Sequence, residues 1–367
     1  MPLFGQSSIN GVDEVMRNFH ETIETIQRNC HIADANHARE MTMCNYLLGM
    51  REYFRWENEL PLTQQPPKHE IGEWLTAREA LWDSLERDNF VPVPVDNRRY
   101  DPFAIDAINQ AIQDQGLVYG AGIGRFHQPH FFLGELVRKE ERDGLVIYVT
   151  GCEYARDITS FPAAYQDGAI ILRMDALKRV LWEKVEMWGL KQQEGALKSA
   201  LDCYGFDKDP DQALNHMAEM ESETVILHEV GEARAGRELG QEWRDMLAGF
   251  NSKRAEVFAR AIKDNLADCI STLPTLIDMQ ARCSLHFYFA EFDGLRKSLF
   301  PALVEGYRVW RETGDDRSLR EAVKTGQQHW LKAAQQLITQ YRNDPHNAEK
   351  NILAQIPADL GHTFCTL

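Results

Sequence analysis

Several features of secreted, membrane-spanning and multiply cross-linked proteins are missing from this sequence. It has no apolar run of about 18 residues, so we expect no transmembrane helix and no membrane partner. Its first residues lack a basic segment followed by a long apolar one, which predicts no secretory signal. Its seven cysteines are scattered and form no C-x-x-C pair, which argues against a disulfide framework. We therefore expect a soluble cytoplasmic protein.

Positive charge is also in short supply. The chain has 40 Lys and Arg residues against 56 Asp and Glu residues, a formal net charge of −16. Such a chain repels a polyanion unless a local basic patch overrides the average. Basic pairs such as Arg98–Arg99 and Lys178–Arg179 are isolated and are most simply solvated surface charges. We expect no nucleic-acid partner.

What the sequence does contain is typical of a chain that buries a core, with 44% apolar and 26% charged residues. Apolar residues at helical spacing dominate both ends, and strand-like runs with short turns lie between them. This pattern predicts an α+β fold, predominantly helical, with a small antiparallel sheet inserted between an N-terminal and a C-terminal helical region. The expected regions are N-terminal helical (1–90), mixed with the sheet (91–174), C-terminal helical (175–343) and a loosely packed polar tail (344–367).

Periodicity and turn residues place the individual elements within these regions. A first helix is expected from about residue 7, and a second from near Cys30 to Trp56. The other expected helices are 70–86, 105–112, 175–188, 211–235, 252–272, 294–311 and 317–341. The expected strands are 117–126, 131–138, 145–150 and 169–173. The segment Val91–Val95 alternates valine with proline and is interpreted as an extended linker.

The sharpest chemical feature is the segment His228-Glu229-Val230-Gly231-Glu232. Residues 228 and 232 lie four apart and share one face of the expected helix. In zinc proteases with an H-E-x-x-H helix, two histidines at this spacing hold the metal, and the glutamate between them is the general base. Here Glu232 stands in the place of the second histidine, and a carboxylate can also ligate zinc.

About one helix further on lies Asp264-Asn265-Leu266-Ala267-Asp268, which resembles the E-x-x-[SA]-D segment of the gluzincin group of zinc peptidases. The resemblance implies that Asp264 is a metal ligand and that Asp268 orients His228 as its hydrogen-bond partner. Glu229 would then polarise the metal-bound water. Two of the three ligand positions depart from the family, which points to a harder divalent ion than zinc, or to no metal.

Two simpler interpretations of these acids stay open. A stripe of charged residues at successive spacings of four runs from Glu256 to Asp268, the pattern of an intrahelical ladder of ion pairs. A partly buried His228 paired with Glu232 or Asp268 would likewise be structural. A second H-E-x-x-E string, His69–Glu73, follows two prolines at an expected helix start, and we interpret it as capping and surface.

Two further groups of polar residues could bind a ligand. The run Glu153–Asp157 directly follows the last clear strand, where charged residues line either a cleft or a solvated turn. A second candidate zinc site shares the spacing of one helix face and is formed by Cys30, Asp34, His37 and Cys44. For that group, core packing and surface polarity are the commoner explanation.

Three stretches also resemble an uncharacterised bacterial protein family: Met50–Glu57, His228–Gly236 and Leu266–Pro274. This resemblance implies no activity.

Two hypotheses of different kinds follow. The first is a zincin-like, peptidase-like, metal-dependent hydrolase, active or degenerate. It would act on a small-molecule or peptide substrate through one divalent ion, zinc or a harder one, on His228, Glu232 and Asp264, with Glu229 as base and Asp268 behind His228. The alternative is a non-catalytic helical protein that binds a partner or a small ligand, with the acidic helices forming structural ion pairs. The oligomeric state does not follow from the sequence.

Overall fold

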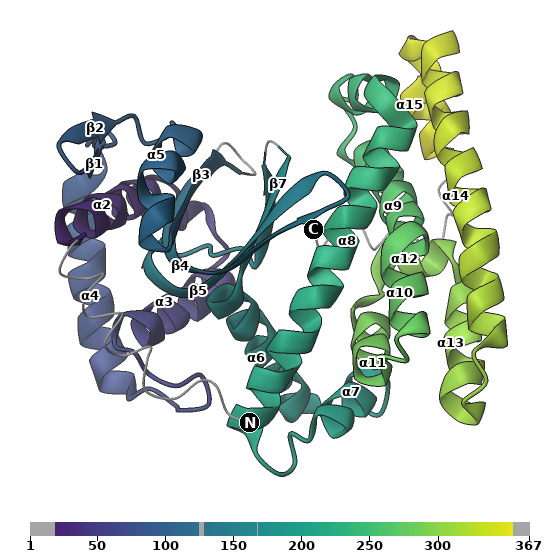
Figure 1. The fold of residues 1–367 in the computed structure, drawn as a ribbon, viewed down its shortest axis with the longest axis horizontal. Coiled ribbons are helices and arrows are strands. Elements are labelled where there is room, and N and C mark those ends of the chain that lie inside the picture. The colour runs from purple at the N-terminus through teal and green to yellow at the C-terminus, as the bar shows by residue number, and fades with distance from the viewer. Residues whose placement is uncertain (1–18, 125–127, 167, 355–367) are drawn as a thin grey trace. The chain divides into compact units, whose positions relative to one another are not determined.

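The computed structural model describes residues 19–124, 128–166 and 168–354, and the chain divides into two compact units between Glu183 and Lys184. The fold is α+β and predominantly helical, and the sheet lies between two helical regions along the chain (Figure 1). This confirms the fold class expected from the sequence. Among the described residues, no helix is both long and apolar enough to cross a bilayer.

Several helices precede or flank the sheet in the described part of the N-terminal unit. They are α2 (His20–His37), α3 (Met43–Glu57), α4 (Lys68–Leu85) and α5 (Ile105–Ile112). Helix α2 buries an apolar stripe at helical spacing in the same core as residues of the sheet; the stripe is formed by Ile23, Ile26, Cys30 and Ala33. The expected helical residues before 19 lie outside the described part of the chain.

The expected helix start near Cys30 is wrong. Helix α2 runs through Cys30 without interruption and ends at His37, and a 3₁₀ turn (Ala38–Glu40) follows. The next helix starts at Met43, where the Thr42 hydroxyl caps it by accepting a hydrogen bond from the Asn45 N–H. The capping threonine marks the true start of this helix, and apolar periodicity alone does not reveal it.

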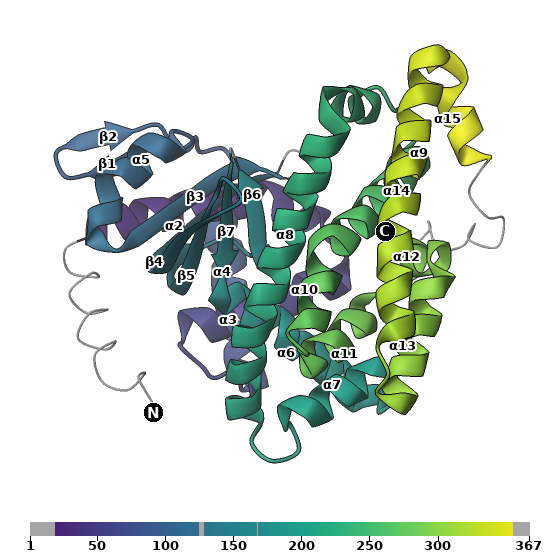
Figure 2. The same ribbon diagram turned by 45° about the vertical axis from the view of Figure 1, so that its right-hand side comes forward.

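The main sheet has the strand order β3-β4-β5-β7-β6 (Figure 2). Its strands are β3 (Leu117–Ile123), β4 (Pro129–Arg142), β5 (Leu145–Arg156), β6 (Ala163–Gln166) and β7 (Ala169–Arg173). All neighbours pair antiparallel except β5 and β7, which run parallel because β6 takes the edge and β7 returns beside β5. Asp143 and Gly144 both have positive φ, as a two-residue hairpin between β4 and β5 requires.

The segment expected to be a linker is part of a second, two-stranded sheet. In it, β1 (Val93–Val95) pairs with β2 (Arg98–Tyr100). Val93 and Val95 are buried, and Thr22 of α2 donates a hydrogen bond to the Pro94 carbonyl at 2.6 Å. Proline is tolerated here because a two-stranded ribbon has edges on both sides.

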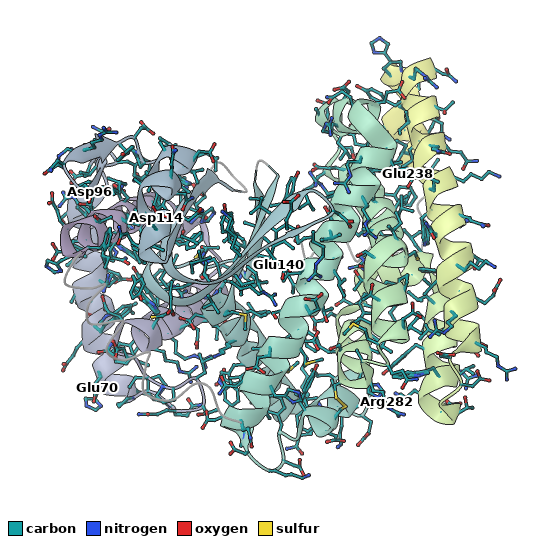
Figure 3. The ribbon with its side chains drawn as sticks, viewed as in Figure 1. Glu70, Asp96, Asp114, Glu140, Glu238 and Arg282 are labelled. Atoms are coloured by element: carbon teal, nitrogen blue, oxygen red, sulfur yellow. A yellow bond between two sulfur atoms is a disulfide. The ribbon has the colours of Figure 1, made fainter. Side chains whose placement is uncertain are left out.

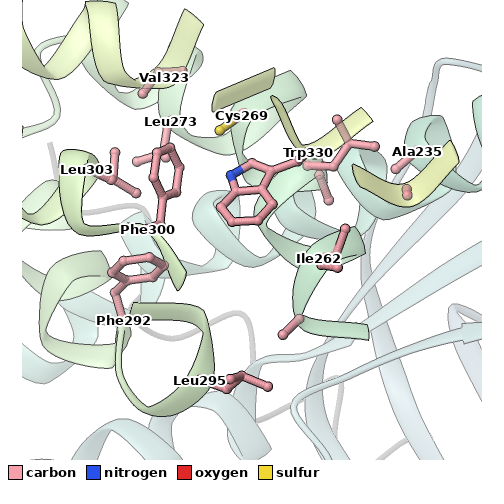
Figure 4. Packing of buried hydrophobic residues seen from close by; sticks show 14 of the residues in the cluster. Ala235, Ile262, Cys269, Leu273, Phe292, Leu295, Phe300, Leu303, Val323 and Trp330 are labelled. Atoms are coloured by element: carbon pink, nitrogen blue, oxygen red, sulfur yellow. The ribbon is translucent and has the colours of Figure 1, made fainter. Parts of the chain in front are cut away.

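Within residues 184–354, the C-terminal unit has helices and no strands, and α6 (Met174–Lys191) leads into it. Its helices are α7 (Ala196–Tyr204), α8 (Pro210–Ala248), α9 (Lys253–Ala267), α10 (Leu273–Asp278), α11 (Arg282–Glu291), α12 (Gly294–Leu299), α13 (Pro301–Thr313), α14 (Arg317–Asn343) and α15 (Pro345–Leu353). Asp209 caps α8 and Pro210 occupies its first turn, which explains why the helix begins close to the expected start at residue 211. Phe300, Trp330 and Leu303 pack in its core (Figure 4).

Three features of this unit differ from the sequence analysis. Cys203 and Cys283 form a disulfide between α7 and α11, whereas the scattered cysteines argued against disulfides. The helices α7, α10 and α11 lie outside every helix expected from the sequence, so the apolar pattern missed them. Where the expected loose tail is described, residues 345–353 form a helix with Ile352 buried, and residues 355–367 lie outside the described chain.

Candidate functional sites

The C-terminal unit brings His228 and Asp268 together from two elements. His228 lies near the middle of α8, and Asp268 begins a π-helical turn (Asp268–Thr272) that follows α9. The two backbones approach closely at Gly231, where an added Cβ would lie 2.5 Å from the carbonyl oxygen of Ala267. Glycine leaves room for this approach because it has no Cβ. Nδ1 of His228 consequently lies 2.8 Å from Oδ1 of Asp268.

Asp268 is a buried carboxylate with partners on both oxygens. Besides His228, it accepts hydrogen bonds from Thr272 Oγ1 (3.0 Å) and the Tyr288 hydroxyl (2.7 Å), and it pairs with the Arg296 guanidinium. Burial would raise its pKa, but the charges of His228 and Arg296 hold that pKa at about 2. Burial would lower the pKa of His228, but the Asp268 carboxylate raises it to about 9. Both groups are therefore charged at neutral pH.

Glu232 and Asp264 belong to the same cluster. Nε2 of His228 lies 3.7 Å from Oε1 of Glu232, and Lys263 donates a hydrogen bond to Oε2 of Glu232 at 2.8 Å. Burial would raise the pKa of Glu232, but the Lys263 ammonium lowers it below its ordinary value. Burial and the Glu232 charge raise the pKa of Asp264 to about 7, and the two carboxyl groups share a hydrogen bond. Below about pH 7, Asp264 therefore holds a proton.

This arrangement fits a closed ion-pair network better than a metal centre. A divalent ion needs a neutral imidazole and deprotonated carboxylates, so it would have to displace the proton that the Asp268 carboxylate favours on His228 and the proton that Glu232 favours on Asp264. The side chains of Lys263 and Arg296 already balance two of the acids. The expected base, Glu229, is half-buried, and burial raises its pKa. Within the residues that the structure describes, no group of three His, Cys, Asp or Glu side chains could hold a metal ion.

The second candidate zinc site separates in the structure. The Cys30 thiol is buried and donates to the Phe131 carbonyl, and Asp34 accepts hydrogen bonds from the Ile158 N–H. His37 lies beside Glu40 at the surface, and Cys44 is exposed on a different helix. The premise that Cys44 continues the helix of Cys30 is wrong, because the chain turns between them.

The second H-E-x-x-E string lies at the surface, as interpreted from the sequence. His69 and Glu70 fall in the first turn of α4, and their side chains are 78% and 54% exposed. The Glu70 side chain stands on the outside of α4 (Figure 3).

A cavity of about 430 Å³ lies in the N-terminal unit. The charged run Glu153–Asp157 was expected to follow the strand, but β5 continues to Arg156, so most of the run forms the end of that strand. Glu153 and Arg156 line it from the end of β5, and Arg179 lines it from the second turn of α6. Its apolar lining includes Trp56 at the end of α3 and Leu60 in the loop that follows. For the run Glu153–Asp157, the structure thus supports the cleft over the solvated turn.

Three arginines are buried around Glu153. Their exposed fractions are 2% for Arg156, 5% for Arg173 and 8% for Arg179. Arg173 Nε lies 2.6 Å and Arg156 Nε 3.9 Å from the Glu153 carboxylate, while Arg179 donates to the Ser160 carbonyl. Burial would raise the pKa of Glu153, but Arg173 and Arg156 hold it below its ordinary value. Burial and repulsion by Arg156 lower the pKa of Arg179 to about 10.

Each of these arginines also has a buried nitrogen without a hydrogen-bond partner in the described part of the chain: Nη2 of Arg156, Nη2 of Arg173 and Nε of Arg179. Leaving a buried donor unpaired costs about 1–3 kcal/mol. Such donors normally meet a water or an ion. Since Arg156 and Arg179 line the cavity, an anion bound there would lie beside two guanidinium groups.

Sequence reasoning missed Arg179, which it placed among solvated surface charges. That interpretation is wrong, whereas Arg98 and Arg99 are exposed as expected. Arg179 follows Ala176 by three residues on α6, so the two share a buried face. Helical spacing could have revealed this burial. No local signal indicates that Trp56 reaches the same cavity.

Fold and cavity together define a two-unit α+β protein whose N-terminal unit holds a charged cavity of small-molecule size. The chain belongs to the family of unknown function DUF6866. Residues 21–173 match the model of its N-terminal domain, and residues 178–359 match the model of its C-terminal domain. No curated protein and no solved structure matched the chain. The resemblance to an uncharacterised family is thereby confirmed, and none of these comparisons shows a likeness to zincins.

Proposed function

We propose that this protein binds a small anionic molecule with an apolar body in the cavity of its N-terminal unit. The observation that carries the proposal is the pair of cavity-lining arginines, Arg156 and Arg179, each with a buried guanidinium nitrogen that lacks a partner among the described residues. Carboxylate and phosphoryl groups are the usual partners of a guanidinium because they accept charge-assisted hydrogen bonds.

The charges around the cavity favour an anion beside Arg179. The Glu153 carboxylate already engages Arg173 and Arg156, and Asp157 engages His130 at 3.1 Å. Arg179 donates its hydrogen bond to a neutral carbonyl, and its lowered pKa reflects burial next to a second cation. The nearby carboxylates of Glu183 and Glu153 only partly offset the cost of burying this cation. A bound anion would add a counter-charge within hydrogen-bonding distance.

The apolar lining of the cavity favours a ligand with a hydrocarbon part. Trp56 is held in place because its Nε1 donates to the Glu153 carbonyl at 3.0 Å and its ring stacks on Tyr53. Leu60 and Leu62 extend this wall from the loop after α3. Ligand cavities of roughly 300–1,000 Å³ typically combine such apolar walls with a few placed polar groups.

Calorimetric titration of the full chain with matched compounds tests the proposal. The probes are 4-methylpentanoate and 3-phenylpropionate, each compared with its neutral amide. We expect the acids to bind and the amides to bind at least about tenfold more weakly, because a hydrogen bond to a charged group contributes about 1.5–3 kcal/mol. In Arg179→Gln, the acids should lose a similar factor.

Arg138→Gln is the matched control, since Arg138 lies in the same unit on β4 with 45% of its side chain exposed. It should leave the titrations unchanged. Equal binding of acids and amides, or binding that survives Arg179→Gln unaltered, would contradict an anion site at this cavity.

Metal-dependent hydrolysis at the His228 cluster is the second candidate. It rests on His228, Glu232 and Asp264, the three positions expected to bind metal, lying in one charged cluster, although in the described chain they do not form a ready set of three ligands. Metal analysis of protein purified without a histidine tag tests it. About one metal ion per chain, lost in His228→Ala, would support this candidate, and metal-free protein would leave the ion-pair network as the role of these residues.

A further inference from the structure

The cavity is lined by acids as well as by arginines, and most of these acids are already paired. Glu52 pairs with Arg55, and Glu57 pairs with Arg78. Two others, Glu59 and Asp175, make no ion pair within the ranges that the structure describes. Glu59 is exposed just after α3, and Asp175 uses its Oδ2 to accept a hydrogen bond from the Glu153 N–H at 3.1 Å.

Both acids line the same cavity as Arg156 and Arg179. Cys152 lies beside them in the lining, and burial raises its pKa to about 12, with the carboxylates of Asp175, Glu135, Glu153 and Glu59 adding to the rise in decreasing order. Arg156 and Arg179 lie close enough to repel each other. The cavity therefore presents two acids and two arginines, with Trp56 and Leu60 supplying apolar surface.

We infer that the ligand is a zwitterion, an α-amino acid with an apolar side chain, whose carboxylate meets Arg156 and Arg179 and whose ammonium meets Glu59 and Asp175. The inference rests on the proposed anion site and specifies its ligand class. A simple carboxylic acid would pair the arginines and bring no cation to the two acids; Asp175 lies within the electrostatic influence of Lys178 and Arg156 but forms no ion pair with either in the described chain. An amino acid satisfies both groups at once, and its side chain covers the apolar wall.

Two matched pairs of compounds isolate the ammonium group. L-Leucine differs from 4-methylpentanoate, and L-phenylalanine from 3-phenylpropionate, only by the α-ammonium. We expect each amino acid to bind the full chain at least about tenfold more tightly than its partner acid, since a charge-assisted hydrogen bond contributes about 1.5–3 kcal/mol. Calorimetric titration measures both members of each pair.

Variants assign the ammonium contact. Glu59→Gln should reduce the preference for the amino acid severalfold and leave the partner acid unaffected or slightly tighter. Glu59 is exposed, so this change should not impair folding. Glu70→Gln, at an exposed position on α4, is the matched control and should keep the full preference.

The outcomes separate the two proposals. If the acids bind as tightly as the amino acids, or if Glu59→Gln keeps the full preference, the zwitterion is wrong and the anion site stands. If neither amino acids nor acids bind, the proposed function itself fails. Tighter binding of the amino acids, diminished in Glu59→Gln and unchanged in Glu70→Gln, supports both.

Discussion

Both units of this protein bury charged side chains, but they treat them differently. In the C-terminal unit, the Asp268 carboxylate receives four donors, and Glu232 is paired with Lys263. In the N-terminal unit, guanidinium nitrogens of Arg156 and Arg179 are buried without partners in the described chain, next to a cavity. A set of buried charges that satisfies itself stabilises a structure, whereas a set that leaves donors unpaired beside a cavity is suited to binding a ligand.

The largest expected loss of stability comes from removing one charge from the ion-pair network around Asp268. Asp268→Asn removes a charge that holds His228 and Arg296, and breaking a buried pair by removing one partner costs about 3–5 kcal/mol. We expect urea unfolding of the full chain to show a loss of this order. Arg179→Met, which removes a buried cation that pairs with no carboxylate within hydrogen-bonding distance in the described chain, should change stability by less than about 1 kcal/mol. Equal losses in the two variants would erase the contrast between the units.

A smaller effect tests the close approach that positions the network. Gly231→Ala places a methyl group 2.5 Å from the Ala267 carbonyl oxygen, and such overpacking costs about 1–3 kcal/mol. Gly236→Ala is the control on the same helix, because nothing lies within 4 Å of its added Cβ. That change should stabilise the protein by about 0.5–1 kcal/mol, since alanine favours a helix. If both substitutions had the same sign, the helices would not be in contact at Gly231.

The smallest effect is a dependence on pH. The pKa of His228 is raised to about 9, so its contribution to stability is fully present below pH 6.5 and is lost as the pH rises through 9. The raised pKa of Asp264 acts in the same direction and is lost as the pH rises through about 7. We expect the free energy of unfolding, measured by urea titration, to fall between pH 6.5 and 9 by at most about 1 kcal/mol per pH unit, because His228 is partly exposed and screened.

His228→Gln supplies the comparison for this pH series. Its urea midpoint should fall less over the same range, because the substituted side chain does not titrate. Parallel curves for the two proteins would mean that His228 does not carry the raised pKa.

Local patterns predicted the architecture well where apolar spacing is regular. The expected strands 117–126, 145–150 and 169–173 correspond to β3, β5 and β7, and the helix expected from residue 211 begins at Pro210. Periodicity failed near Thr42, because α2 ends at His37 and a new helix, capped by Thr42, begins at Met43. It also failed at Pro94, because a proline that usually marks a linker is tolerated in a short ribbon.

Sites depend on contacts between distant segments, and their predictability differed accordingly. His228 and Asp264 were proposed to converge because a known family motif carries the long-range information, and the structure brings both into one cluster. What the motif did not supply is the charge state, which depends on Lys263 and on Arg296 from another helix. The cavity had no motif, so Trp56 and Arg179, more than 100 residues apart, became neighbours only in the folded chain.

The disulfide between Cys203 and Cys283 closes a covalent ring across a sequence separation of 80 residues. This ring contains the charged residues of the His228 cluster: His228, Glu232, Asp264 and Asp268. A ring of this size restricts the unfolded chain by about 4–5 kcal/mol of conformational entropy. Arg296, the guanidinium that engages Asp268, lies outside the ring. Reduction of this bond would therefore lower the free energy of unfolding of the unit by freeing its unfolded chain, so the redox state of two sulfurs sets how stably the buried charges stay assembled.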